Sequence, residues 1–222
     1  MSYFSILILL FIALLFLLVL NKIIIILKNE QREAIQITAN TLPSSEKLDD
    51  KNNYKELKGL QFELLIKNCL NATMDTYFKV LHDINIEVNG KKTQIDVILL
   101  TYAGIYVIES KNWEGSIYGK YNDYKWTQVL KNGEKNYYFN PIKQNKYHIQ
   151  ILSEYLKLPL NKFYSYIIFS NDTKINEYIY KYQRIKLLKY EHMLKQIRYD
   201  LKNNAIRLTY EQIDKIYYLL KY

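Results

Sequence analysis

A short segment in the middle of the chain limits the possible folds more than any other feature. Two apolar runs flank a tight turn at Gly104; Asp96 begins the first run and Glu109 lies near the end of the second. Antiparallel pairing of Leu100 with Ile105 across the turn sets the register. Asp96 then falls directly opposite Glu109 on one face of the sheet, with Cβ atoms about 4.5–5.5 Å apart. Two ionised carboxylates at that distance repel each other, so a positive charge must lie beside them or one must be protonated.

Lys111 is the candidate for that positive charge. It follows Glu109 by two residues, so the alternation of a strand places both side chains on one face. Mg²⁺ takes oxygen ligands, usually one or two carboxylates with water and phosphate. We therefore expect Asp96 and Glu109 to bind Mg²⁺ or Mn²⁺, and Lys111 to orient or deprotonate a water or to stabilise charge on a phosphate. The alternative is an exposed ion pair of Asp96 with Lys111, but apolar residues on both faces of these strands favour the functional interpretation.

The N-terminal segment is almost wholly apolar. Residues 3–20 contain a single polar interruption, Ser5, and the apolar character continues to Leu27 after a short break. About 20 apolar residues cross a bilayer as a helix, which predicts a transmembrane anchor over residues 1–28. The alternative is a cleaved signal peptide, but no Lys or Arg precedes the run and no small-x-small site follows it.

Basic residues predict the orientation of this anchor. Lys22, Lys28 and Arg32 follow the apolar run and none precedes it. Because basic residues stay on the cytoplasmic side, we expect a single-pass protein of the cell membrane with its C-terminal domain in the cytoplasm. Cys69 is the only cysteine, which excludes a disulfide within the chain.

The formal net charge of +9 is concentrated toward the C-terminus. From Lys174 to the end there are eleven Lys and Arg against five Asp and Glu, interleaved with tyrosines. Such a distribution suits a polyanion, either nucleic acid or an anionic lipid surface. The alternative is compositional, because Lys, Asn, Ile and Tyr are abundant throughout the chain.

The remaining chain divides into a linker and one compact domain. Residues 29–53, which include Pro43 and two serines, indicate a polar stalk and linker. A core over 54–160 and a C-terminal strand with basic helices over 161–222 are expected to form the domain. The pattern predicts helices at 54–70, 141–157, 191–202 and 209–220, and strands at 77–88, 93–101, 105–111, 116–121, 125–130 and 163–170. This order predicts an α/β or α+β fold, a sheet flanked by helices.

The order of the charged residues is similar to a known nuclease pattern. Asp96, followed after twelve residues by Glu109-Ser110-Lys111, resembles the D-x(n)-E-x-K motif of the PD-(D/E)XK nucleases. Further matches, over about residues 55–160, resemble the nuclease-related domain (NERD) family. They are Gly59-Leu60-Gln61-Phe62-Glu63, Gln94-Ile95-Asp96, Gly104 to Trp113, Gly115, Trp126, Asn140-Pro141 and Gln144-Asn145. The resemblance implies a restriction-endonuclease-like mixed sheet, a role in DNA processing, Asp96 and Glu109 as metal ligands and Lys111 as the catalytic lysine.

One departure from the family concerns its first helix. The family usually carries Gly before the Glu of this helix, whereas this chain has Phe62 before Glu63. The resemblance makes Glu63 a third metal ligand, and a bulky Phe62 is expected to alter how closely the helix approaches the sheet. The alternative for Glu63 is an exposed pair with Lys67, worth about 0.2–0.5 kcal/mol. Both interpretations stay open.

The predicted helix after Pro141 carries further candidates. Resemblance to related nucleases suggests that Gln144, at the start of this helix, helps to hold the metal site or the substrate. His148 lies one turn later on the same side, where we expect an ordinary surface histidine. Asn140 is expected to cap the helix.

Aromatic residues have two interpretations. Trp113 and Trp126 are expected to bury apolar area. The run Tyr137-Tyr138-Phe139 suits either stacking on nucleic-acid bases or cross-strand packing, and the pattern does not choose between them.

Three functions are consistent with these features. The first is Mg²⁺-dependent hydrolysis of DNA phosphodiester bonds by a membrane-anchored enzyme on the cytoplasmic side. The second is a non-catalytic module of the same fold that binds nucleic acid or a protein at the membrane, which Phe62 and the basic C-terminal segment favour. The third is a membrane-tethered scaffold whose basic segment lies on anionic lipid.

Overall fold

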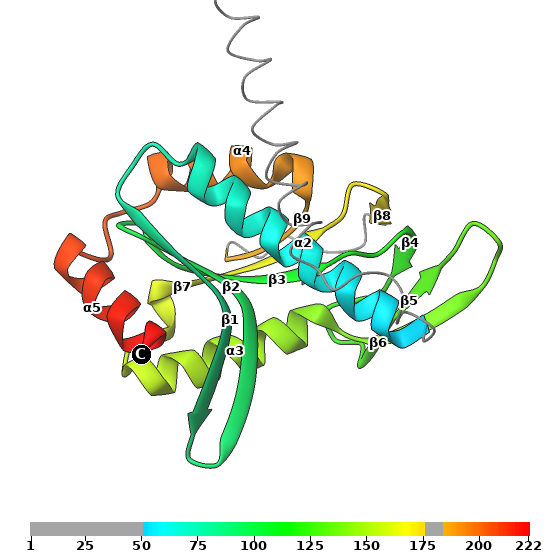
Figure 1. Ribbon diagram of the computed structural model, residues 1–222, viewed down its shortest axis with the longest axis horizontal. Coiled ribbons are helices and arrows are strands. Elements are labelled where there is room, and N and C mark those ends of the chain that lie inside the picture. Colours follow the sequence, from blue (N-terminus) through cyan, green and yellow to red (C-terminus); the bar gives the residue numbers. More distant parts are fainter. Residues whose placement is uncertain (1–50, 176–183) are drawn as a thin grey trace, which may run out of the picture. The chain divides into compact units, whose positions relative to one another are not determined.

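The computed structural model describes residues 51–175 and 184–222 of the chain (Figure 1). The predicted membrane anchor over residues 1–28 lies outside the described residues, as does most of the predicted linker. Within the described ranges, no helix has the length and apolar character needed to cross a bilayer. Residues from Asp50 to Tyr222 form one compact unit.

A five-stranded mixed sheet forms the centre of this unit. Its spatial order is β1 (Phe78–Val88), β2 (Lys91–Thr101), β3 (Gly104–Lys111), β7 (Phe163–Phe169) and β9 (Ile185–Lys189). The β1–β2 and β2–β3 pairs are antiparallel, whereas β7 is parallel to both β3 and β9. Every residue of β7 is buried, which is the pattern of a strand covered on both faces.

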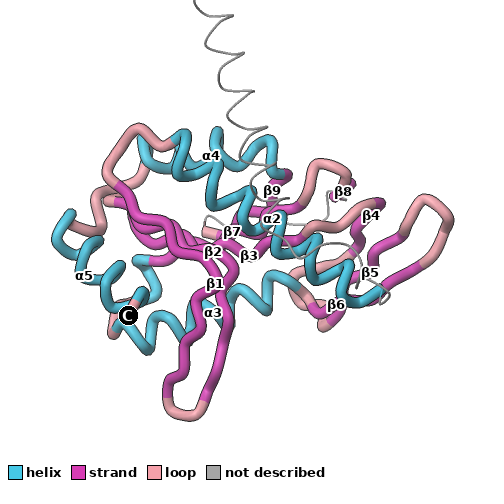
Figure 2. Tube along the Cα trace, viewed as in Figure 1, coloured by secondary structure: helices cyan, strands magenta, loops and turns pink. Residues whose placement is uncertain are grey.

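Two helices cover each face of this sheet (Figures 1 and 2). On one face α2 (Lys51–Thr73) and α4 (Tyr190–Asn203) bury apolar side chains at helical spacing. Those side chains are Phe62, Ile66, Leu70, Met193, Ile197 and Leu201. On the other face α3 (Pro141–Leu156) and α5 (Tyr210–Lys221) contribute Ile151, Leu152, Ile213 and Ile216. The predicted mixed α/β arrangement with flanking helices is therefore confirmed.

A second, smaller sheet follows β3 (Figure 2). Its order is β6 (Lys135–Phe139), β5 (Lys125–Val129), β4 (Gly115–Tyr118) and β8 (Thr173–Ile175). A separate cluster beneath it joins Trp126 and Ile117 to Ile142 of α3 and to Phe169 at the end of β7. The sequence pattern predicted β4 and β5 but neither β8 nor β9, and it did not separate the two sheets.

The central hairpin has the predicted register up to its last pair. Leu100 pairs with Ile105 as expected, and the β2–β3 ladder ends at Val97 and Ile108, one pair before Asp96 and Glu109 would meet. Asp83, which faces this point from β1, has a φ of 53°. Such a left-handed residue interrupts the strict alternation of side chains along a strand. On β2, Ile95 and Ile98 lie on either side of Asp96 and Val97 and pack in the same core cluster, although strict alternation would separate them.

Asn140 joins the small sheet to α3. Its side-chain oxygen accepts the backbone N–H of Ile142 at 2.9 Å, so the predicted helix cap is confirmed. Its amide nitrogen donates to the backbone carbonyls of Lys120, Tyr121 and Asp123. The side chain is completely buried, so these carbonyl groups have no water to replace a lost donor.

Replacing Asn140 by Ala is expected to lower the free energy of unfolding by about 2–4 kcal/mol, because it removes the cap of α3 and the buried amide that donates to three backbone carbonyl groups. Chemical denaturation of the full-length chain measures this change. Asn203→Ala is the matched control, since Asn203 is exposed and donates only to Tyr199 within α4. The control is expected to stay within about 0.5 kcal/mol of the wild type. Equal losses in the two variants would contradict the role assigned to Asn140.

Candidate functional site

Asp96 lies where β2 separates from β3. Its Oδ2 accepts the backbone N–H of Ser110 at 2.7 Å and the Ser110 hydroxyl at 3.0 Å. The carboxylate therefore replaces the ladder partner that the N–H of Ser110 would otherwise need. Among the described residues, none forms a hydrogen bond or ion pair with Oδ1 of Asp96, and the residue is half-buried. This oxygen is the part of Asp96 that is available to a ligand.

Glu109 is held by two partners although only 1% of its side chain is exposed. Lys111 Nζ lies 2.5 Å from Oε1, and His148 Nε2 lies 3.0 Å from Oε2. The other ring nitrogen of His148, Nδ1, is 2.5 Å from the hydroxyl of Thr93. An ionised carboxylate can only accept, so Nε2 carries a proton, and Nδ1 of a neutral ring then accepts from Thr93.

His148 does not lie on the surface, so the expectation of an ordinary surface histidine is wrong. His148 is only 6% exposed, because the inner face of α3 packs on the sheet. Asn145, one turn earlier, fixes this packing. Its amide nitrogen donates to the carbonyl of Val107, to the hydroxyl of Ser165 and to the carbonyl of Tyr166. The helical spacing predicted that His148 lies on the same side of α3 as Gln144. It did not indicate that this side of the helix faces β3.

Glu63 comes to the site from α2. It is half-buried, and the described residues contain no ion pair between Glu63 and Lys67, so the exposed-pair interpretation is wrong. Phe62 is buried and packs edge-on against Tyr190 of α4, with ring centroids 5.9 Å apart. The bulky side chain before Glu63 is thus accommodated in the core cluster that α2 and α4 form with the central sheet.

Burial and mutual repulsion shift two of these carboxyl groups toward neutral pH. Burial, together with the charges of Asp96, Asp83 and Glu109, raises the pKa of Glu63 to about 7. Burial and the charge of Glu109 raise the pKa of Asp96 to about 6, against the opposing effect of Lys111 and the bonds from Ser110. Burial and repulsion between neighbouring negative charges are the causes expected when several acids share one site.

Glu109 and Lys111 shift in the opposite sense. Burial alone would raise the pKa of Glu109, but Lys111 and His148 outweigh it and hold this pKa below its ordinary value. Burial alone would lower the pKa of Lys111, but the charges of Glu109, Asp96 and Glu63 raise it. The pair is therefore ionised at neutral pH, and the ammonium group of Lys111 faces three carboxyl groups.

Neighbouring residues support Lys111 and α2. The Nζ of Lys111 lies 5.9 Å from the centre of the Trp113 ring, which stacks on Tyr138 with centroids 4.6 Å apart. The amide of Asn112 donates to the carbonyl of Lys58 at 2.8 Å and ties the end of β3 to α2. Trp126 is fully buried, so its predicted packing role is confirmed, while Trp113 also covers the site lysine.

The donor set suits a hard divalent cation, although the described geometry does not form a finished metal site. Three carboxyl groups face one lysine, and oxygen ligands of this kind are those that Mg²⁺ and Mn²⁺ prefer. Within the described residues, no group of three or more His, Cys, Asp or Glu side chains has metal-binding geometry. Both oxygens of Glu109 are bonded, Oε1 to Lys111 and Oε2 to His148.

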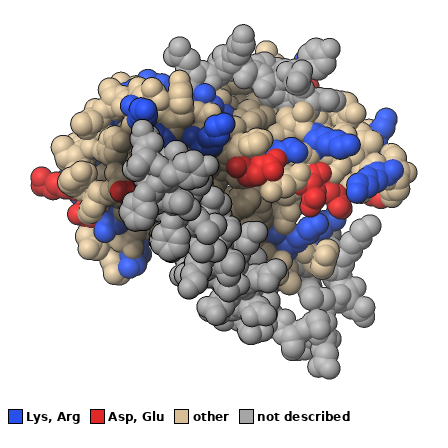
Figure 3. Space-filling view, turned by 90° about the horizontal axis from the view of Figure 1, so that it is seen from above, with Lys and Arg blue, Asp and Glu red and all other residues tan. Residues whose placement is uncertain are grey.

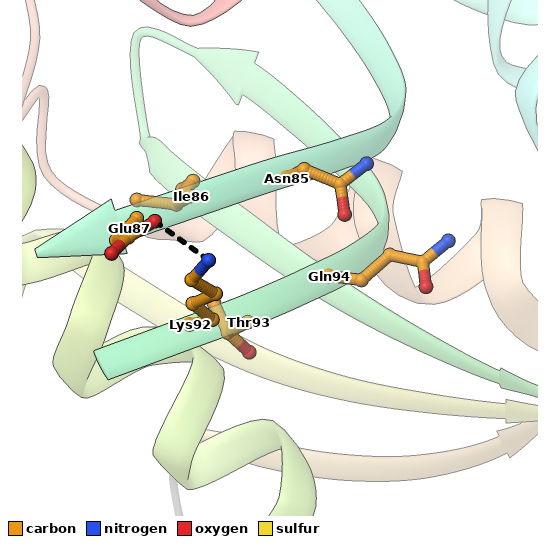
Figure 4. A pocket seen from close by; sticks show the side chains of 6 residues that line it. All are labelled: Asn85, Ile86, Glu87, Lys92, Thr93 and Gln94. Atoms are coloured by element: carbon orange, nitrogen blue, oxygen red, sulfur yellow. Dashed lines mark ion pairs between the residues drawn. The ribbon is translucent and has the colours of Figure 1, made fainter. Parts of the chain in front are cut away.

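A pocket of about 540 Å³ lies on the β1–β2 hairpin and is distinct from the carboxylate cluster (Figure 4). Its lining residues are Asn85, Ile86, Glu87, Lys92, Thr93 and Gln94. Figure 4 shows Glu87 and Lys92 facing each other across the two strands, where their charged groups are 3.1 Å apart. Thr93 connects the two places, because its hydroxyl contacts His148.

Surface charge is mixed on the face of the molecule that Figure 3 shows. Figure 3 shows Lys and Arg side chains at several places on one face, with Asp and Glu side chains between them. On this face the basic side chains do not form one continuous patch, so charge alone does not define a nucleic-acid groove.

The sequence matches the nuclease-related domain (NERD) family over residues 58–170, which is half of the chain. The matched range contains Glu63, Asp96, Glu109, Lys111 and Gln144. The chain belongs to this family, as the pattern around Asp96 and Glu109 indicated.

Individual relatives extend this comparison. An uncharacterized protein of Bacillus anthracis is 35% identical over 103 residues, which is 46% of this chain and 48% of that protein. The chain thus spans about half the length of this curated relative. Among solved structures, AF1548, a protein of unknown function, is 13% identical, with 61% of this chain and 59% of that chain covered and a TM-score of 0.32. Can2 from Sulfobacillus thermosulfidooxidans, solved with cyclic tetra-adenylate, is 15% identical, with 79% and 51% covered and a TM-score of 0.37.

Replacing Glu63 by Gln is expected to raise the free energy of unfolding relative to the wild type more at pH 8 than at pH 5. The folded-state pKa of about 7 lies above the ordinary value of 4.5, so the folded state binds the proton more tightly and the wild type loses stability as the pH rises from about 5 to 7. Gln cannot ionise, and we expect it to recover about 1–2 kcal/mol at pH 8 after allowance for solvent screening.

Denaturation at the two pH values in EDTA-containing buffer measures this difference. Glu87→Gln, on the exposed part of the β1–β2 hairpin, controls for the loss of one surface carboxylate. A stability difference between wild type and Glu63→Gln that is the same at both pH values would contradict the assigned environment of Glu63.

Proposed function

We propose that this protein is a Mg²⁺-dependent nuclease that hydrolyses DNA phosphodiester bonds, tethered to the cytoplasmic face of the cell membrane. The observation that carries the proposal is the convergence of Glu63, Asp96 and Glu109 on Lys111 at the point where the β2–β3 ladder ends. One ammonium group does not balance three carboxylates. The remaining negative charge suits a divalent cation.

The three acids would divide the work of holding that cation. Asp96 would use Oδ1, because Oδ2 is bonded to Ser110, and Glu63 would use its carboxylate from α2. Glu109 would share Oε1 between the cation and Lys111. When bound, the cation supplies a coordinated water of lowered pKa and neutralises charge on the phosphate. Gln144, on the same helix as His148, is proposed to contact the substrate or a coordinated water.

The charge state of Lys111 favours one of its two predicted roles. Neighbouring carboxylates raise its pKa, so the side chain is an ammonium group at neutral pH. An ammonium group cannot accept a proton from water. We therefore assign Lys111 to the stabilisation of negative charge that develops on the phosphate, and not to deprotonation of the water.

DNA as the substrate and the membrane as the location rest on other parts of the chain. Membership of the nuclease-related domain family supports nucleic acid as the ligand. The excess of Lys and Arg beyond Lys174 supports a polyanionic ligand. The apolar run of residues 3–20, with basic residues only after it, supports a cytoplasmic orientation.

A second candidate function is a binding module that does not cut its ligand. The observation that favours it is the internal neutralisation of Glu109, whose two oxygens bond to Lys111 and His148 without any added ion. Such a site would bind nucleic acid or a protein partner at the membrane with no turnover. Metal binding separates the two candidates, because only the nuclease needs Mg²⁺ or Mn²⁺.

Asp96→Asn and Lys111→Met are each expected to lower the rate of DNA cleavage by at least about 100-fold, because the first removes a metal ligand and the second the charge beside the phosphate. The test incubates the full-length chain, purified in detergent, with plasmid, linear and single-stranded DNA in Mg²⁺, Mn²⁺ or EDTA. Glu87→Gln is the matched control, since it removes an exposed carboxylate from the same hairpin.

Cleavage that continues at the wild-type rate in Asp96→Asn would contradict the nuclease assignment. DNA binding without cleavage, together with no calorimetric heat on addition of Mg²⁺ or Mn²⁺, would support the binding module instead.

A further inference from the structure

The small sheet has two faces of different character. Along β5 and β6 more buried and more exposed residues alternate, and β4 ends with buried Ile117 and exposed Tyr118, so each strand sends one set of side chains inward and the other outward. Trp126 and Ile117 lie on the inward face and are fully buried, and Tyr138 on this face stacks on Trp113 beside the site lysine. The outward face therefore has to be explained separately.

Three aromatic rings dominate the outward face. Tyr118 of β4 and Tyr137 of β6 both pair in register with Thr127 of β5, so they flank this threonine in one row. Phe139 follows Tyr137 by two residues along β6. The exposed fractions are 46% for Tyr118, 62% for Tyr137 and 41% for Phe139. Folding itself does not require large rings at exposed positions.

Two lysines lie at the ends of this row of rings. Lys135 precedes Tyr137 by two residues on β6, and Lys125 of β5 pairs in register with Phe139. Both are exposed, and neither has an ion-pair partner among the described residues. The three strands contain no Asp or Glu. Positive charge on this face is therefore not balanced within its own strands.

We propose that the outward face of β4, β5 and β6 binds single-stranded nucleic acid, with bases stacked on Tyr118, Tyr137 and Phe139 and phosphates paired with Lys125 and Lys135. The proposal rests on the proposed function for the class of ligand. Outward side chains on one strand recur about every 6.5–7 Å, which suits successive unstacked nucleotides of an extended strand. A base presents its flat face only when it is not paired in a duplex, so the rings select single strands.

The small sheet lies beside the carboxylate cluster, and this position also suits a surface that binds the substrate. Tyr138, whose neighbours Tyr137 and Phe139 point outward, contacts Trp113 on the inward side, and Trp113 covers Lys111. A strand held on the outward face would thus lie on the same sheet whose other face borders the carboxylate cluster. Its role would be to retain the substrate and not to cleave it.

The test measures the affinity of the full-length chain, purified in detergent, for a fluorescein-labelled 20-nucleotide oligo(dT) by anisotropy in EDTA. Tyr137→Ala is expected to weaken binding by at least about five-fold, since loss of one stacking partner costs about 1–3 kcal/mol. Tyr199→Ala is the matched control, because Tyr199 of α4 has the same exposed fraction of 62%. Equal affinities for the two variants would overturn the proposal.

The double variant Lys125→Gln with Lys135→Gln tests the phosphate contacts. Its slope of log affinity against log salt concentration is expected to be shallower by about 1.4, because each phosphate contact on a single strand contributes about 0.7. Lys146→Gln with Lys157→Gln, two exposed lysines on α3 and directly after it, removes the same charge outside both this face and the basic C-terminal segment. An equal change in slope in the two double variants would overturn the phosphate contacts.

Other occupants of the face give different results. A duplex of the same length is expected to bind more weakly and to be insensitive to Tyr137→Ala. Light scattering that shows a dimer in the wild type and a monomer in Tyr137→Ala would identify the face as a self-interface and overturn the proposal.

Failure of this proposal and failure of the nuclease assignment are distinguishable. The two variants have separate measurements: Asp96→Asn is measured by cleavage in Mg²⁺, and Tyr137→Ala is measured by affinity for oligo(dT) in EDTA, where no metal-dependent cleavage takes place. Normal cleavage in Asp96→Asn with weakened binding in Tyr137→Ala would overturn the nuclease assignment alone. Lost cleavage in Asp96→Asn with normal binding in Tyr137→Ala would overturn the single-strand surface alone.

Discussion

The buried ion pair of Glu109 with Lys111 is the interaction on which the arrangement of this protein depends. An ionised carboxylate with 1% of its side chain exposed is unfavourable unless every oxygen has a partner. Those partners come from two elements, since Lys111 follows on β3 and His148 reaches Glu109 from α3. Thr93 of β2 in turn holds His148. The sheet and α3 must therefore dock correctly for Glu109 to remain charged.

Local patterns were enough to predict the elements that surround this pair. The pairing of Leu100 with Ile105 followed from the apolar runs and the turn, and Asn140 before Pro141 indicated the start of α3. The pattern missed the contact of Asp96 with Ser110 for a physical reason. The contact forms where the β2–β3 ladder stops, opposite the left-handed residue Asp83 of β1, and non-glycine residues rarely adopt this conformation.

Longer-range features were beyond local reasoning. The strands Thr173–Ile175 and Ile185–Lys189 are short and pair in parallel with strands far away in the sequence, so no hairpin turn marks them. Burial of His148 likewise depends on how α3 docks, and helix spacing does not reveal this. The run Tyr137-Tyr138-Phe139 had two interpretations, and alternation on β6 divides it between them. Tyr138 packs on Trp113, whereas Tyr137 and Phe139 are exposed and their stacking on bases stays a proposal.

The account depends on the three carboxyl groups forming one binding site for a divalent cation. An anomalous difference map from crystals of the protein grown with Mn²⁺ tests this directly, because it locates the ion without reference to any activity. The account predicts one peak within coordination distance of oxygens of both Asp96 and Glu63, beside Glu109. The absence of a peak there at saturating Mn²⁺, or a peak only at other carboxylates, would contradict it.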